Sequence, residues 1–350
     1  MISFYPGPSQ IYPEIKNFMV QAVDDGILSV NHRSPAFVAM AKGTVLTLKK
    51  KLHIPDSYQV YFVSSATESW EIIAQSLIDS GSCHIFNGAF GQKWFEYTSK
   101  LASSVRSVSF LAEEQLNVEN TIISEDLICL THNETSNGTQ LADVVLNAFR
   151  EKYPDKLIAV DATSSMAGVY IDFEKADIWF ASVQKCFGLP AGLGLLICSP
   201  KAIEKARVIN NQKHYNSLVF LDDMMQKYQT TYTPNVLGIY LLGKVAEMIP
   251  DIKITSENIK SRRKELETKL HNLKHVEFLI KDKNLRSDTV LALEGESVHI
   301  EAIKRLAKEQ GLLLGNGYGA WAKTTFRIAN FPALQDRDFN PLIDLLQNYA

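Results

Sequence analysis

Short apolar runs alternate with helical patterns along the first two thirds of the chain. Between residues 70 and 78, apolar side chains recur at i, i+3, i+4, i+7 and i+8, which predicts a helix with one apolar face. Ser65 or Thr67 is expected to cap its start. Seven runs rich in apolar and β-branched residues are predicted strands: 58–65, 83–87, 105–110, 127–131, 157–161, 178–182 and 193–198. This alternation predicts an α/β fold around a largely parallel sheet.

After Pro234 the pattern changes to longer helical stretches. The predicted elements there are helices at 236–248 and 256–273, a strand at 289–293, a helix at 299–310, strands at 312–314 and 325–329, and a helix at 337–348. A chain of 350 residues exceeds the usual size of one hydrophobic core. We therefore expect a large domain at 12–245 and a smaller α+β domain at 246–350, which also takes in residues 1–11.

Composition and charge exclude several classes of protein. The formal net charge of -3 gives no broad cationic field for nucleic acid or an anionic membrane, and the lysines at 49–51 are interpreted as a solvated helix end. The N-terminus lacks a signal-peptide layout, and no apolar segment has membrane-spanning length, so we expect a cytoplasmic protein. The four cysteines have neither the spacing of a zinc site nor that of a disulfide framework, which predicts reduced, buried thiols and no metal. They are Cys83, Cys129, Cys186 and Cys198.

A carboxylate and a lysine follow two consecutive predicted strands. Asp161 closes the strand at 157–161, and Lys185 comes shortly after the strand at 178–182. Ligands of open α/β sheets bind beyond the carboxyl ends of the strands, so both side chains are expected to face one crevice. The glycines and the proline that follow Lys185 suit a tight, open loop against a cofactor.

This pair of side chains has the chemistry that pyridoxal 5'-phosphate (PLP) requires. A carboxylate beside the ring nitrogen keeps that nitrogen protonated, which lets the ring take up electrons. A lysine holds the aldehyde as a Schiff base and, once substrate displaces it, moves a proton. Singly, Asp161 could cap a turn and Lys185 could lie on the surface. Together, with Gln184 beside the lysine, they predict a PLP site.

Further motifs match one known family in order along the chain. They are Pro6-Gly7-Pro8, His32-Arg33-Ser34, Asn133-Glu134-Thr135, Asp161-Ala162-Thr163, Gln184-Lys185, Tyr232-Thr233-Pro234 and Arg327-Ile328-Ala329-Asn330. By these motifs the chain resembles the class V aminotransferases of fold type I, and among them the phosphoserine aminotransferases. The resemblance implies a large domain with a mostly parallel seven-stranded sheet flanked by helices, and a smaller C-terminal domain. It also implies PLP as the cofactor.

The resemblance further implies how the cofactor is held. Thr135 and Gln184 would hydrogen-bond the phenolic O3' of its ring. The backbone at Ala66 and Thr67 would hold its phosphate at the start of a helix, where N–H groups are free.

Aromatic and inter-subunit contacts are implied as well. Phe90 would stack on the ring, with Trp94 as the second candidate and core packing as the alternative for both. Tyr232 and Thr233 would reach the cofactor phosphate of a neighbouring subunit. A homodimer with shared active sites is therefore expected.

Substrate contacts are implied at three positions, and two others depart from the family pattern. Arg327 would hold the substrate carboxylate, while His32 and Arg33 would bind a substrate phosphate in the partner's site. Glu68 stands where the family has an arginine, and the loop at 314–319 lacks the family's His-Arg pair. A carboxylate at that place would penalise a dianionic phosphate.

Several functions therefore stay open. The first is transfer of an amino group between phosphoserine and 2-oxoglutarate, with His32, Arg33 and either Lys323 or Lys93 at the phosphate. The second is an aminotransferase for an unphosphorylated small amino acid such as serine or alanine, with pyruvate or glyoxylate. A PLP lyase or cysteine desulfurase is the third, suggested by the loop at 65–69, although that chemistry needs a mobile cysteine. A scaffold without activity would not need the Asp161 and Lys185 pair.

Overall fold

A seven-stranded sheet forms the larger part of the computed structural model, which describes residues 1–349. In spatial order its strands are β2 (Gln59–Val63), β10 (Gly194–Cys198), β9 (Ile178–Ser182), β8 (Leu157–Asp161), β5 (Leu127–Thr131), β3 (Ser82–Phe86) and β4 (Val105–Ser109). β10 runs antiparallel to both of its neighbours, and the other pairs are parallel. The seven predicted strands and their mostly parallel sheet are confirmed.

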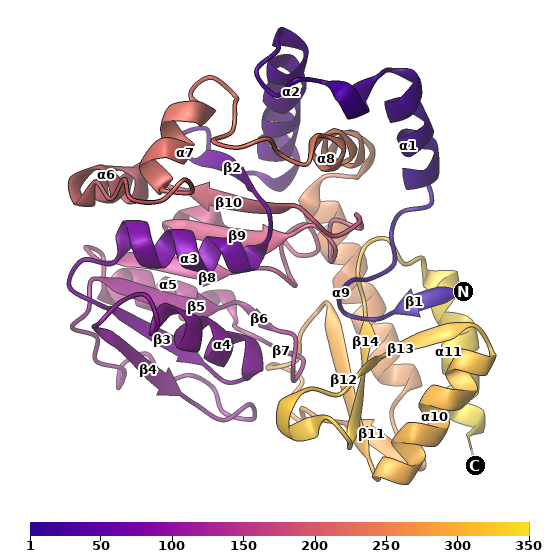
Figure 1. Ribbon diagram of the computed structural model, residues 1–350. Coiled ribbons are helices and arrows are strands. Elements are labelled where there is room, and N and C mark those ends of the chain that lie inside the picture. Colours follow the sequence, from indigo (N-terminus) through magenta and orange to yellow (C-terminus); the bar gives the residue numbers. More distant parts are fainter. Residues whose placement is uncertain (350) are drawn as a thin grey trace.

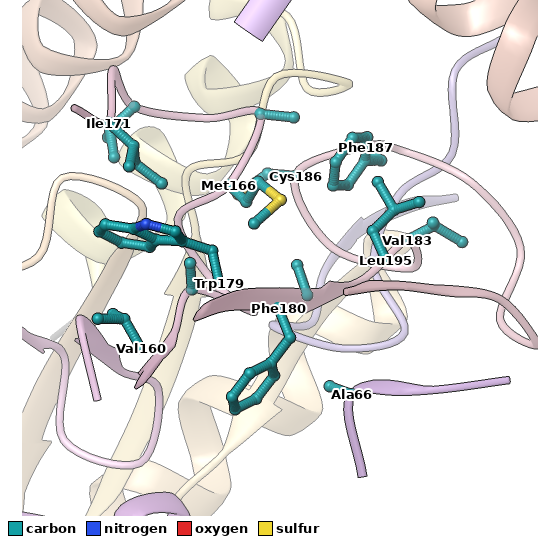
Figure 2. Packing of buried hydrophobic residues seen from close by; sticks show 14 of the residues in the cluster. Ala66, Val160, Met166, Ile171, Trp179, Phe180, Val183, Cys186, Phe187 and Leu195 are labelled. Atoms are coloured by element: carbon teal, nitrogen blue, oxygen red, sulfur yellow. The ribbon is translucent and has the colours of Figure 1, made fainter. Parts of the chain in front are cut away.

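Helical segments cover both faces of this sheet (Figure 1). Phe180 of β9 meets Trp94 of α4 (Ala89–Thr98) edge-on, with ring centroids 5.0 Å apart. Its neighbour Trp179 meets Phe173 of η2 (Phe173–Lys175) at 5.6 Å. Figure 2 shows these two consecutive side chains on opposite sides of the strand, as the two-residue period of a β-strand requires. The other helices of this part are α1 (Ile15–Asp24), η1 (Ile27–Ser29), α2 (Pro35–Leu52), α3 (Ala66–Leu77), α5 (Asp143–Lys152), α6 (Pro200–Ile209), α7 (Leu218–Met225) and α8 (Val236–Met248).

A second, five-stranded sheet carries the C-terminal part of the chain. Its strands, in spatial order, are β1 (Ile2–Phe4), β13 (Leu312–Asn316), β14 (Thr325–Ala329), β12 (Val290–Gly295) and β11 (Val276–Phe278). The helices around it are α9 (Ile252–Lys269), α10 (Ser297–Glu309), η3 (Gly319–Trp321), η4 (Asp336–Phe339) and α11 (Asn340–Asn348). β1 pairs with β13, so the N-terminus lies beside the C-terminal elements (Figure 1). This pairing supports the proposed division into residues 12–245 and 246–350 with 1–11.

Some element boundaries differ from the predicted ones for local reasons. α9 begins at Ile252 rather than at residue 256, because the Asp251 side chain caps it by accepting a hydrogen bond from Lys253 N. Ser65, not Thr67, caps α3, since its hydroxyl accepts from Glu68 N. The predicted helix at 337–348 is a short η4 followed by α11. The three-residue strands β1 and β11 escaped prediction because such short runs carry little periodicity.

Two further expectations concerned the lysines at 49–51 and the four cysteines. The lysines at 49–51 form the last turn of α2, and the four cysteines are free and buried. Within residues 1–349, every helix is too short or too polar to cross a membrane.

Candidate active site

Most of the predicted site residues line one cavity. It has a volume of about 510 Å³, within the usual range for cofactor sites. It opens beyond the end of β8, the strand that Asp161 closes. Eight predicted residues line it: Ala66, Thr67, Phe90, Thr135, Asp161, Gln184, Lys185 and Arg327. Asp161 and Lys185 thus share a single crevice.

Lys185 is buried with its amine held by two hydroxyl groups. Its Nζ donates to Ser164 Oγ at 2.9 Å and to Thr135 Oγ1 at 3.2 Å. Burial lowers the pKa of Lys185 to about 8, and the nearby Asp161 carboxylate opposes that shift. An amine with this pKa is neutral often enough near pH 7 to act as a nucleophile.

Asp161, the carboxylate of the pair, is buried as well. Its Oδ1 accepts a hydrogen bond from Thr163 N at 2.9 Å, so it does cap the following turn. Burial raises the pKa of Asp161, and hydrogen bonds from Thr163 together with the charge of Lys185 oppose this. The capping role and a role at a cationic ring are compatible, because a carboxylate accepts at both oxygens.

Glu134 is a site residue to which the sequence had given no role. Its buried carboxylate accepts hydrogen bonds from Ser136 N and Oγ, at 2.9 and 2.6 Å, and from Gly91 N at 3.1 Å and Phe90 N at 3.2 Å. Burial raises the pKa of Glu134, while these donors oppose the shift. The carboxylate therefore fixes the first turn of α4 and, with it, the position of Phe90. The Asn-Glu-Thr motif was the signal that could have revealed this.

Of the two predicted stacking candidates, Phe90 lines the cavity and Trp94 does not. Lys185 Nζ lies 5.2 Å from the Phe90 ring centroid, and this ring stacks on Tyr318 at 5.0 Å. Trp94 is 1% exposed and packs in the core against Phe180. Tyr318 is a second residue that the sequence did not suggest.

The start of α3 also lies at the cavity, but Glu68 does not line it. Ala66 N donates to Ser182 Oγ at 2.8 Å. The Glu68 carboxylate accepts from Ser64 N at 2.6 Å and from Tyr215 OH at 3.0 Å. The Glu68 carboxylate keeps its negative charge, but it lies outside the cavity lining and faces donors of the protein itself.

Arg327 is buried and anchored by backbone carbonyl groups. Its Nε donates to Asn316 O at 2.7 Å and its Nη1 to Thr135 O at 2.8 Å. A guanidinium has five N–H groups, and these two bonds leave three for a ligand. The arrangement suits recognition of a carboxylate.

Four predicted residues lie away from this cavity. Arg33 Nη1 donates to Gln229 Oε1 at 3.0 Å, and His32 packs edge-on against Phe37. Partial burial and the neighbouring Arg33 lower the pKa of His32. The Tyr232 ring meets Tyr215, and Thr233 is exposed. A single chain does not bring them to its own Lys185.

The side chains present fit PLP. Asn133 Nδ2 is a buried polar atom without a hydrogen-bond partner, and Asn133 lines the cavity. Buried polar groups are normally paired, so this amide awaits a polar ligand. The cavity also offers a carboxylate, an amine, an aromatic face and a helix start. When bound, PLP supplies an aldehyde that combines with amines and a ring that takes up electrons.

Comparisons with known proteins agree with this geometry. Residues 5–320 match the family described as Aminotransferase class-V. The phosphoserine aminotransferase of Corynebacterium glutamicum is 27% identical, over 96% of this chain and 91% of that protein. The crystal structure of a phosphoserine aminotransferase from Cytophaga hutchinsonii has a TM-score of 0.94 and 33% identity, covering 99% of this chain and 98% of that one. A PLP-bound phosphoserine aminotransferase from Trichomonas vaginalis, 17% identical with a TM-score of 0.82 over 99% of each chain, shares the fold. The chain is a PLP-dependent transaminase that belongs to the class V aminotransferase family.

Proposed function

We propose that this enzyme exchanges an amino group between phosphoserine and 2-oxoglutarate, giving 3-phosphohydroxypyruvate and glutamate. The observation that carries the proposal is the end-to-end similarity to proteins of that name, with 33% identity to one solved structure. The position of Glu68 is compatible with it, because this carboxylate lies outside the cavity lining and accepts hydrogen bonds from Ser64 and Tyr215.

The cofactor contacts follow from the lining of the cavity. Asp161 pairs with the ring nitrogen and keeps it protonated. Lys185 binds the cofactor covalently and then moves the proton of the substrate. Phe90 covers one face of the ring, and its position is fixed by Glu134.

Polar contacts complete the cofactor site. Thr135 and Gln184 hydrogen-bond the phenolic oxygen, while Ala66 and Thr67 hold the phosphate at the start of α3, where a phosphate oxygen takes the place of Ser182 Oγ as the acceptor of Ala66 N. Arg327 holds the substrate carboxylate through the N–H groups that its carbonyl partners leave unused.

A homodimer in the cytoplasm completes the proposal. His32, Arg33, Tyr232 and Thr233 then serve the site of the partner subunit, since they lie away from their own cavity. Exposed apolar side chains on α1 and η1 support a covered surface in this region: Val20 at 55%, Val23 at 60% and Leu28 at 53% exposure. Such a patch is typical of an interface between subunits.

An unphosphorylated small amino acid is the second candidate substrate. The observation that favours it is the charge of the cavity, where Lys185 and Arg327 are the cationic side chains in the lining that the structure describes. Lys185 is assigned to the cofactor and Arg327 to the substrate carboxylate, so neither is left for a substrate phosphate. A desulfurase is disfavoured because all four cysteines are buried.

The two substrates are separated by a direct assay. Purified enzyme is supplied with phosphoserine and 2-oxoglutarate, and in parallel with serine or alanine and glyoxylate. Turnover of the first pair with much higher kcat/KM supports the proposal. Turnover of the second pair alone contradicts it. Lys185→Ala controls for a contaminating transaminase.

A further inference from the structure

A lysine and two aromatic rings form a cluster at the mouth of the cavity. Phe90 and Tyr318 both line the cavity, and their rings stack with an interplanar angle of 26°. Lys93 lies one turn after Phe90 on α4 and donates a hydrogen bond to the Tyr318 hydroxyl. Its Nζ is 5.0 Å from the Tyr318 centroid and 6.0 Å from the Phe90 centroid. The cluster joins α4 to the loop before η3.

The ammonium group of Lys93 is fixed in place and stays charged. The hydrogen bond to Tyr318 raises the pKa of Lys93 further above neutrality. Contact with two rings holds the ammonium while leaving it partly hydrated. Lys93 is exposed, whereas both rings that it touches face the cavity, so its charge lies at the entrance.

The cluster also lies where a substrate side chain would extend. The guanidinium carbon of Arg327 is 5.6 Å from the Tyr318 ring centroid. A small amino acid whose carboxylate is bound by Arg327 therefore has Tyr318 beside it. A side chain that extends past Tyr318 toward the cavity mouth points to the Lys93 ammonium, which donates a hydrogen bond to the Tyr318 hydroxyl.

We propose that Lys93 and Tyr318 bind the distal anionic group of the substrate. This inference rests on the proposed function and names the residues that select its substrates. Phosphoserine carries a phosphate at that end and glutamate a carboxylate, so one site serves both. A phenol and an ammonium supply a hydrogen bond and a charge to either anion.

The test compares Lys93→Gln with the wild-type holoenzyme. We expect KM for phosphoserine and for glutamate to rise about tenfold, the size of one charge-assisted contact, with kcat nearly unchanged. KM for alanine, or its inhibition constant if it is not turned over, should stay the same. Tyr318→Phe should show a smaller change of the same kind, and Lys93→Arg should retain most of the affinity. Inorganic phosphate should inhibit Lys93→Gln more weakly than it inhibits the wild type.

Lys100→Gln is the matched control. Lys100 follows the same helix and its Nζ also lies over an aromatic ring, 4.8 Å from the Tyr97 centroid, but Tyr97 does not line the cavity. This variant should leave all constants unchanged.

The outcomes separate the two proposals. If the wild type turns over glutamate but not phosphoserine, the proposed function fails, and the effect of Lys93→Gln on glutamate still decides the role of Lys93. If both are turned over and Lys93→Gln changes phosphoserine and alanine equally, the assignment of Lys93 fails alone. Turnover of neither anionic substrate overturns both.

Discussion

Gly7 packs against the side chain of Lys185. A Cβ atom on Gly7 would lie 2.9 Å from Lys185 Cε, closer than real Cβ contacts allow, and the Gly7 φ of +143° favours glycine. Residues 1–11, which join the smaller sheet through β1, therefore also shape the surroundings of the lysine. This contact explains in physical terms why a Pro-Gly-Pro motif at the N-terminus belongs to a PLP site.

Gly7→Ala should displace Lys185 and weaken cofactor attachment. We expect a loss of stability of about 1 kcal/mol from the backbone strain, together with reduced absorbance of covalently bound PLP. Gly26→Ala is the control, because Gly26 also has a positive φ, +69°, but has no neighbour within 4 Å of its Cβ position. Equal absorbance in the two variants would contradict a specific effect on Lys185.

Glu134→Gln should destabilise the start of α4. The carboxylate accepts four hydrogen bonds, and an amide would aim an N–H group at one or more of these donors. We expect a loss of roughly 2 kcal/mol in urea unfolding and weaker PLP binding through a displaced Phe90. Glu96→Gln, on the exposed side of the same helix, should change neither property.

The sequence was sufficient to predict the proximity of those site residues whose positions follow from the order of the strands. Asp161 and Lys185 follow adjacent strands, and the carboxyl ends of those strands meet at one edge, so their proximity could be predicted without coordinates. Most of the seven strands were recognisable because they are short apolar runs buried on both faces, whereas the edge strand β4 is partly exposed and has two valines as its apolar residues. Phe90, which the resemblance ranked above Trp94, is the one that lines the cavity, while Trp94 is buried in the core.

The parts of the site that the sequence did not predict depend on contacts between segments far apart in the chain. Tyr318 reaches Phe90 from the loop between β13 and η3, across more than 200 residues, and no local pattern encodes that pairing. The contact of Glu68 with Tyr215 is of the same kind, and the sequence alone could not place this carboxylate outside the cavity lining.

Arg327→Lys should impair binding although the charge is kept. Lysine lacks the planar fork, and its ammonium cannot serve the carbonyl groups of Asn316 and Thr135 while also binding a carboxylate in two places. We expect KM for every amino acid substrate to rise by roughly 10- to 100-fold. Steady-state kinetics with phosphoserine and alanine check this, and an effect on phosphoserine alone would contradict a role at the shared carboxylate.

The pKa of Lys185 should set the pH dependence of cofactor attachment. Only the neutral amine attacks the aldehyde, so with a pKa of about 8 the rate at which apoenzyme binds PLP covalently should rise with pH and level off above about 9. An ordinary lysine would keep gaining reactivity up to about pH 10.4. Stability should also rise with pH. Between about pH 8 and the ordinary lysine pKa, Lys185 is protonated in the unfolded chain and neutral in the folded one. The contribution of Lys185 to the free energy of unfolding therefore increases with pH in that window. Absorbance on mixing apoenzyme with PLP measures the rate, and Lys185→Ala gives the non-covalent background. A half-maximal rate near pH 10 would show that the buried amine keeps an unshifted pKa.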